Sequence, residues 1–122
     1  MTVYNYIINL TPHRLIIHKR PGDRIPAVVE QSGLLARIDV KQDLDGVVCG
    51  DIPVHSTAMG SVSCSNADGE TLTFPEPQDG TVYITSLVVA QAVRRRDVLS
   101  PGPLVRDDDG YPIGCLGLSR HA

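Results

Sequence analysis

The chain has 122 residues and a formal net charge of −3, with 42% hydrophobic and 20% charged residues. This length and composition predict one soluble globular domain over residues 1–122 and exclude a disordered chain. The negative charge argues against nucleic acid or an anionic membrane surface as a partner, and no apolar run reaches the length of a membrane span.

The N-terminal stretch MTVYNYIINL lacks the basic segment and the small-residue cleavage site of a signal peptide. We therefore expect a cytoplasmic protein, in the host cytoplasm if a phage encodes it. Three widely spaced cysteines, Cys49, Cys64 and Cys115, form no metal-binding or redox motif. We expect all three to be reduced thiols, mostly buried, and we expect neither a metal nor another cofactor.

The first half of the chain predicts short strands separated by turns. Residues 3–10 and 14–18 are rich in apolar, β-branched residues and predict two strands. Residues 25–33 follow the turn sequence KRPGDR and are expected to be extended. Residues 35–44 predict a strand with one wet face, because apolar and polar residues alternate in its first part. The Asp-Gly pair at 45–46 predicts a hairpin turn directly after it.

The second half begins with strand signals and continues into turns. Residues 47–65 predict one or two further strands, interrupted at Gly50 and Gly60. Residues 66–70 predict another turn, and the proline-rich residues 74–80 predict a stiff connection.

One helix and a final hairpin complete the predicted elements. The β-branched stretch 81–86 predicts a strand, and Ser86 is a natural N-cap for a helix over about 86–96 that ends in three arginines. Residues 104–118 predict a hairpin around an Asp-Gly turn. Together these elements predict an α+β fold: a compact mixed, mostly antiparallel β-sheet, sandwich-like or barrel-like, with this one main helix and the C-terminal hairpin.

A candidate ligand site follows from the strands at 3–10 and 81–85. If they are parallel neighbours, their carboxyl ends meet at one sheet edge beside the N-terminus of the helix, where ligands with phosphate groups bind in many α/β proteins. An arginine would supply a cation for phosphate. The predicted ligand-binding residues are Asn9, Thr11, His13, Thr85 and Ser86, with Arg37 or Arg106 as the cation.

Structural roles compete with each of these assignments. Ser86 could only cap its helix, and Thr11 and His13 could only form a turn. Each arginine could only pair with a surface aspartate. His13 could act as a general base, although a lone histidine without a visible partner is more typical of a turn. The four histidines lack the spacing of a metal site.

Four segments resemble a family of small proteins encoded by phages and actinobacteria. They are NLTPH at 9–13, the segment 51–54, the segment 75–92 with its PEPQDGTVYITS core, and the closing RDDDGYPIGCL at 106–116. By type, the chain also resembles small phage sponge proteins, which sequester nucleotide immune signals such as cyclic ADP-ribose derivatives or cyclic dinucleotides. That resemblance implies a pocket that binds phosphate and a homo-oligomeric assembly.

The resulting functional hypothesis is a phage anti-defence protein that binds and sequesters a nucleotide-derived immune signal. One alternative is a metal-independent phosphodiesterase that cleaves such a signal with His13 as the base. Another is a phage accessory structural protein, in which NLTPH is only a turn. We also expect a homo-oligomer, because the chain is short and poor in aromatic residues.

Overall fold

The computed structural model describes residues 3–122. Its elements, in chain order, are β1 (Tyr6–Asn9), β2 (Leu15–His18), β3 (Ala27–Val29), β4 (Leu35–Val48), β5 (Ile52–Ser65), β6 (Thr71–Thr73), β7 (Thr81–Ile84), α1 (Leu87–Val93), β8 (Val98–Pro101), β9 (Leu104–Arg106), β10 (Pro112–Leu116) and β11 (Leu118–Arg120). This is the predicted α+β composition, rich in short strands and with one helix.

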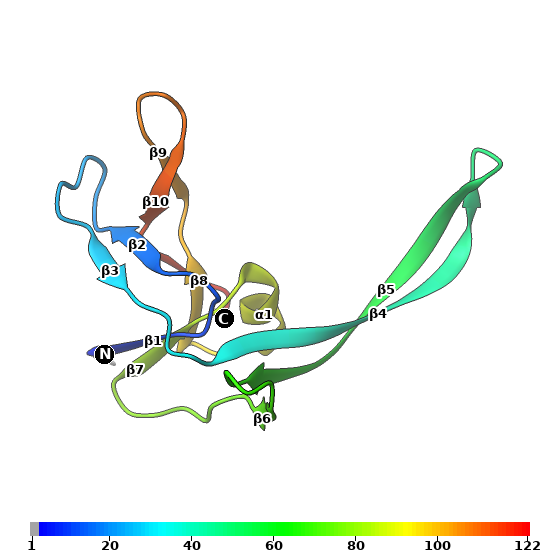
Figure 1. Cartoon of the computed structure of the whole chain (residues 1–122), viewed down its shortest axis with the longest axis horizontal. Helices are drawn as coiled ribbons and strands as arrows, with labels where there is room; N and C mark the ends of the chain where they lie inside the picture. The colour runs from blue at the N-terminus through cyan, green and yellow to red at the C-terminus, as the bar shows by residue number, and fades with distance from the viewer. Residues whose placement is uncertain (1–2) are drawn as a thin grey trace.

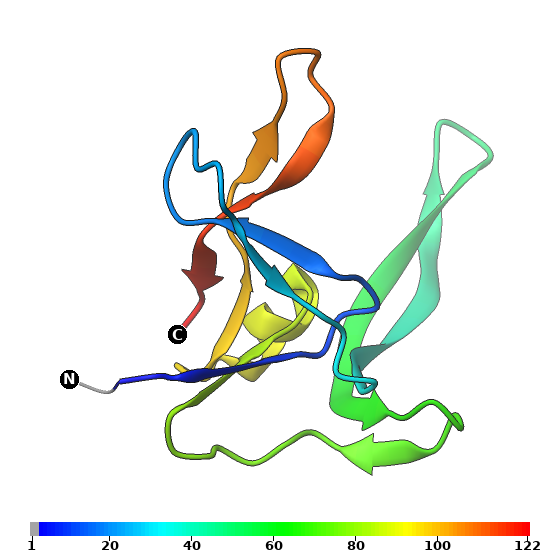
Figure 2. The same ribbon diagram turned by 60° about the vertical axis from the view of Figure 1, so that its left-hand side comes forward.

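The strands form three sheets (Figures 1 and 2). The first has the order β1-β7-β8-β11, in which β1, β7 and β8 run parallel and β11 antiparallel. The second has the order β3-β2-β10-β9, and the third is the meander β4-β5-β6. Within residues 3–122 none of these sheets closes on itself, so the barrel-like variant of the predicted fold is not found.

The core forms where the first sheet, the helix and the base of the third sheet meet. β7 is buried along its whole length, as its β-branched and aromatic sequence TVYI predicts for a central strand. Tyr83 lies in this core, and its hydroxyl donates to the carbonyl of Glu76 at 3.2 Å. Ala36 and Cys64, a facing pair on β4 and β5, attach the third sheet to the same core.

The helix begins as predicted and ends earlier. Ser86 is the N-cap, and its hydroxyl accepts the backbone N–H of Val89 at 3.4 Å. The predicted end near residue 96 is wrong, because the helix ends at Val93 and Arg94 adopts a left-handed conformation. Arg95 does not interact with the helix end; it makes a two-pronged contact with Asp97, at 2.9 and 2.6 Å.

The largest departure from expectation is the hairpin of β4 and β5. The predicted turn at Asp45-Gly46 is wrong: both residues lie inside β4, where the register shifts. The chain reverses instead at Cys49 and Gly50, which both have positive φ. Nor does Gly60 interrupt a strand, since it lies inside β5 at a second register shift. Each strand is therefore 14 residues long.

The cysteines are free, as predicted, but they differ in exposure. Cys64 and Cys115 are buried, whereas Cys49 is exposed at the hairpin turn. Burial raises the pKa of the Cys64 thiol. Across residues 3–122, the one helix is too short to cross a membrane.

Candidate functional site

The predicted meeting of two strand ends is present. β1 and β7 are parallel neighbours with Asn9 beside Ile84, so the segments that follow them leave the sheet at the same edge. There they border a cavity of about 750 Å³. Four predicted ligand-binding residues line it: Thr11, His13, Thr85 and Ser86.

Asn9 lies beneath this cavity and shapes it. Only 1% of the residue is exposed. Its Nδ2 donates to the carbonyls of His13, at 2.8 Å, and Val29, at 3.3 Å. Its Oδ1 accepts both the backbone N–H of Thr11, at 2.9 Å, and the Thr11 hydroxyl, at 2.7 Å. The Asn9 amide thus holds the turn that presents Thr11 and His13, and does not itself line the cavity.

The hydroxyls at the start of the helix have partners of their own. The Thr85 hydroxyl donates to the Ser86 carbonyl at 2.9 Å, and the Ser86 hydroxyl caps the helix. The helix has only seven residues, so its dipole adds little to the site. The predicted capping role of Ser86 is therefore established, and any contact with a ligand comes in addition to it.

The opposite wall comes from residues that the sequence analysis did not single out. β11 pairs antiparallel with β8, which places Ser119 beside Ser100. The chain end that follows brings His121 back to the cavity, where its Nε2 hydrogen-bonds to the Ser100 hydroxyl at 2.8 Å. No spacing motif joins residues 21 positions apart, and the polar sequence Ser119-Arg120-His121 gives no local sign that the C-terminal tail returns to a sheet.

The rest of the lining is apolar. It consists of Pro12, Leu15, Leu87, Pro101, Gly102 and Pro103. Gly102 is required for close packing here, because a Cβ at this position would overlap the carbonyl oxygen of Leu116. The backbone N–H of Gly102 donates to the carbonyl of Gly117, the residue between β10 and β11, at 3.0 Å, which joins the cavity wall to the connection between the second and first sheets.

The two predicted cations lie elsewhere. Arg37 is an exposed residue of β4, in the third sheet, and Arg106 is an exposed residue of β9 whose guanidinium donates to the Gly110 carbonyl at 2.8 Å. Neither lines the cavity. A cation does reach a neighbouring cavity of about 760 Å³, which shares His13, Leu15 and Pro101 with the first. This cation is Arg14, whose Nε lies 3.0 Å from Oε1 of Glu30.

The cavity thus combines apolar walls with hydroxyls and two imidazoles, those of His13 and His121. Hydroxyls and neutral imidazoles both donate and accept hydrogen bonds, so the lining suits ligands rich in hydroxyl and phosphoryl oxygens that also have a flat apolar part. Among residues 3–122, no cluster of three or more His, Cys, Asp or Glu side chains could hold a metal ion.

Comparison with known proteins supplies no relative. No family model, no curated protein and no solved structure matches this chain. The resemblance to phage and actinobacterial proteins therefore stays a prediction.

Proposed function

We propose that this chain is a phage anti-defence protein that binds a nucleotide-derived immune signal and sequesters it without cleavage. The ligand would be a cyclic ADP-ribose derivative or a cyclic oligonucleotide. The choice of ligand class rests on the resemblance to sponge proteins. The location of the site rests on the cavity between the ends of β1 and β7 and the C-terminal tail.

The cavity supports this proposal by its size and chemistry. Its volume of about 750 Å³ lies within the range of about 300–1,000 Å³ that is usual for small-molecule sites. The walls formed by Leu15, Leu87 and Pro103 suit the faces of a nucleobase. The imidazoles and hydroxyls around them suit ribose hydroxyls and phosphate oxygens.

Calorimetric titration with cyclic ADP-ribose derivatives and cyclic dinucleotides tests the proposal, with linear ADP-ribose and AMP for comparison. We expect His13→Ala to weaken binding about tenfold to a hundredfold, since a lost hydrogen bond to a charged ligand group costs about 1.5–3 kcal/mol. His55→Ala is the matched control, because His55 lies on the β4–β5 hairpin and not at the cavity. Equal ligand affinities of the wild type, His13→Ala and His55→Ala would show that the ligand binds outside this cavity. If none of these compounds binds, the alternative of a phage accessory structural protein is favoured.

One observation favours the enzyme as a second candidate. The cavity contains a serine hydroxyl within hydrogen-bond distance of an imidazole, Ser100 and His121, and a second imidazole, His13. Such pairs can move protons during phosphodiester cleavage. Chromatography of the ligand released by heat separates the two functions. A binding protein returns the ligand intact, whereas an enzyme returns products, and that yield should then fall in the His13→Ala variant.

A further inference from the structure

The hairpin of β4 and β5 extends far from the rest of the molecule (Figures 1 and 2). Its base is held by the core through Ala36 and Cys64, and β6 pairs only with residues 63–65. Residues 39–61, called the arm below, form a two-stranded ribbon in which each strand has one free edge. An isolated ribbon of two strands is at best marginally stable in water.

One face of the arm is largely apolar, interrupted by the Gln42–Thr57 pair and by His55, and it continues the core-facing side of the sheet. Strand residues alternate between the two faces, and directly paired residues share a face. Following this alternation outward from Ala36 and Cys64, and allowing for the two register shifts, gives one continuous row of pairs. It consists of Ile38 with Val62, Val40 with Met59, Gln42 with Thr57, Leu44 with His55, and Val47 with Pro53.

This face is exposed beyond the base of the arm. Val40, Leu44, Val47 and Met59 are 50–67% exposed. Ile38 and Met59 line a common groove with Val88 of the helix, which confirms that they lie on the same side. A long apolar stripe without a covering layer marks an interaction surface.

The end of the arm carries a strong charge imbalance. Its tip, residues 43–51, contains Asp43, Asp45 and Asp51 and no lysine or arginine; Lys41, just outside the tip, has its Nζ 3.9 Å from the Asp43 carboxylate. Val47 and Val48 are exposed beside these carboxylates. A binding partner for the tip therefore needs both cations and an apolar contact.

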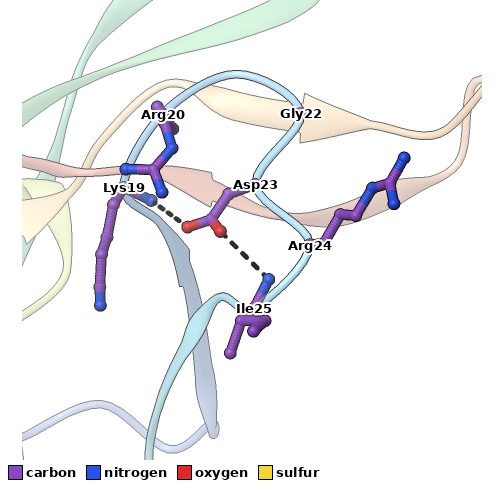
Figure 3. A pocket seen from close by; sticks show the side chains of 6 residues that line it. All are labelled: Lys19, Arg20, Gly22, Asp23, Arg24 and Ile25. Atoms are coloured by element: carbon purple, nitrogen blue, oxygen red, sulfur yellow. Dashed lines mark hydrogen bonds between the residues drawn. The ribbon is translucent and has the colours of Figure 1, made fainter.

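The loop between β2 and β3 has the complementary chemistry. Its open hollow of about 520 Å³, the basic hollow, is lined by Lys19, Arg20, Gly22, Asp23, Arg24 and Ile25 (Figure 3). Ile25 is 82% exposed.

Asp23 shapes the basic hollow from within. Its carboxylate accepts the backbone N–H groups of Lys19, at 3.0 Å, and Ile25, at 3.1 Å. These two hydrogen bonds lower the pKa of Asp23. The carboxylate is thus engaged with the backbone, and the three cationic side chains extend from the loop in different directions (Figure 3).

The tip and the hollow lie at opposite ends of the longest axis of the molecule, so one copy cannot bring them together (Figure 1). We propose that the partner is a second copy of this chain: the acidic tip of each copy docks in the basic hollow of the other, and the apolar face of the arm lies along the partner's body.

The contact area favours a reciprocal exchange. An arm strand of ten residues spans about 33 Å and a two-stranded ribbon is about 10 Å wide, so one face offers about 330 Å² in projection. A stable interface buries about 800 Å² per partner. One arm alone falls well short of this area. In a reciprocal dimer, each copy buries the face of its own arm and also the part of its body that the partner's arm covers. The buried area per copy is then about twice that of one arm, before the contacts of the tip are added.

Charge-reversal variants test this assembly independently of any ligand. We expect sedimentation velocity at about 50 μM to show a wild-type dimer, because an interface of standard size holds well below this concentration. Replacing Lys19, Arg20 and Arg24 by Glu should weaken the dimer at least tenfold, and so should replacing Asp43, Asp45 and Asp51 by Lys. A variant with Glu at the exposed positions Arg94, Arg96 and Arg120 is the control and should remain dimeric.

Mixing provides the decisive measurement. The two reversed variants repel themselves but complement each other at both contacts, so an equimolar mixture should form a heterodimer. Circular dichroism establishes that each variant is folded before mixing. A wild-type monomer, reversed variants that remain dimeric alone, or a mixture that stays monomeric would overturn the proposal.

A covalent trap adds a second test. Cys49 lies in the turn of the arm and is exposed, so under mild oxidation it should form an intermolecular disulfide with a cysteine introduced by Arg24→Cys. Adding Cys49→Ser should abolish this product. A cross-linked species that persists without Cys49, or no cross-link at all, would contradict the contact.

Discussion

Residues in the N-terminal turn have two different roles: some stabilise the turn, and others are exposed at the surface. Asn9 and His13 are four positions apart, yet the first is buried with three different partner residues and the second is exposed. Both were predicted to contact a ligand. Burial separates them: a side chain whose donors and acceptors are already used shapes a site, whereas an exposed imidazole remains free to bind.

Replacing Asn9 with Ala should therefore be costly for folding. The change leaves the Thr11 N–H and the Val29 carbonyl without the Asn9 amide, and the His13 carbonyl keeps only its hydrogen bond from the Thr11 hydroxyl. We expect a loss of about 2–4 kcal/mol in the free energy of unfolding. Urea denaturation measures it. His13→Ala should stay within about 0.5 kcal/mol of the wild type, because the side chain is exposed. If the two variants lose the same stability, Asn9 does not hold the turn.

At the scale of one element, the helix shows how a local conformation overrides a charge pattern. The three arginines after Val93 look like the cationic end of a longer helix. Instead, Arg94 adopts φ of 53° and ends it, with its N–H donating to the Ala90 carbonyl at 3.1 Å. This left-handed position is one that glycine occupies without steric cost.

Arg94→Gly should consequently stabilise the protein. Relief of about 1–2 kcal/mol of left-handed strain exceeds the added entropy of an unfolded glycine, so we expect a net gain of about 0.5–1 kcal/mol. Thermal unfolding followed by circular dichroism measures the shift. Arg96→Gly is the matched control: Arg96 is exposed without a positive φ, and its replacement should be slightly destabilising. A loss of stability in both variants would contradict the left-handed end.

For the whole molecule, the structure divides into a packed body and an exposed arm. β7 and β8 are buried and have neighbours on both sides, whereas the arm has a solvent-exposed apolar face and free edges. Local opening is easiest where few buried contacts protect the backbone hydrogen bonds. Stability in the arm is therefore expected to depend on a partner.

Hydrogen exchange at two protein concentrations measures this dependence. At about 1 μM, near the range where modest dimers dissociate, the amides of residues 39–61 should exchange quickly. At about 100 μM the arm and the loop at 19–25 should become protected together, while β7 and β8 are protected at both concentrations. Identical exchange of the arm at both concentrations would show that it is stable without a partner.

The sequence by itself determined the local features of this protein. Ser86 was identifiable as a helix cap because capping needs only a hydroxyl before an apolar, helix-forming run. β7 was identifiable because a β-branched and aromatic segment suits a buried strand. The shared edge of β1 and β7 followed from the polar residues after each strand, once the two were taken as parallel. This local information also brought Thr11, His13, Thr85 and Ser86 into one site.

Only the tertiary structure decided which distant residues meet. Ser100 and His121 join the cavity because β11 pairs with β8, a contact that no local pattern encodes. The turn at Cys49-Gly50 replaced Asp45-Gly46 because pairing from the core-bound base of the hairpin sets the register, and the intrinsic preference of an Asp-Gly pair is weaker than a long ladder of backbone hydrogen bonds. Long-range pairing places each segment in the fold, and local propensity only shapes the segment.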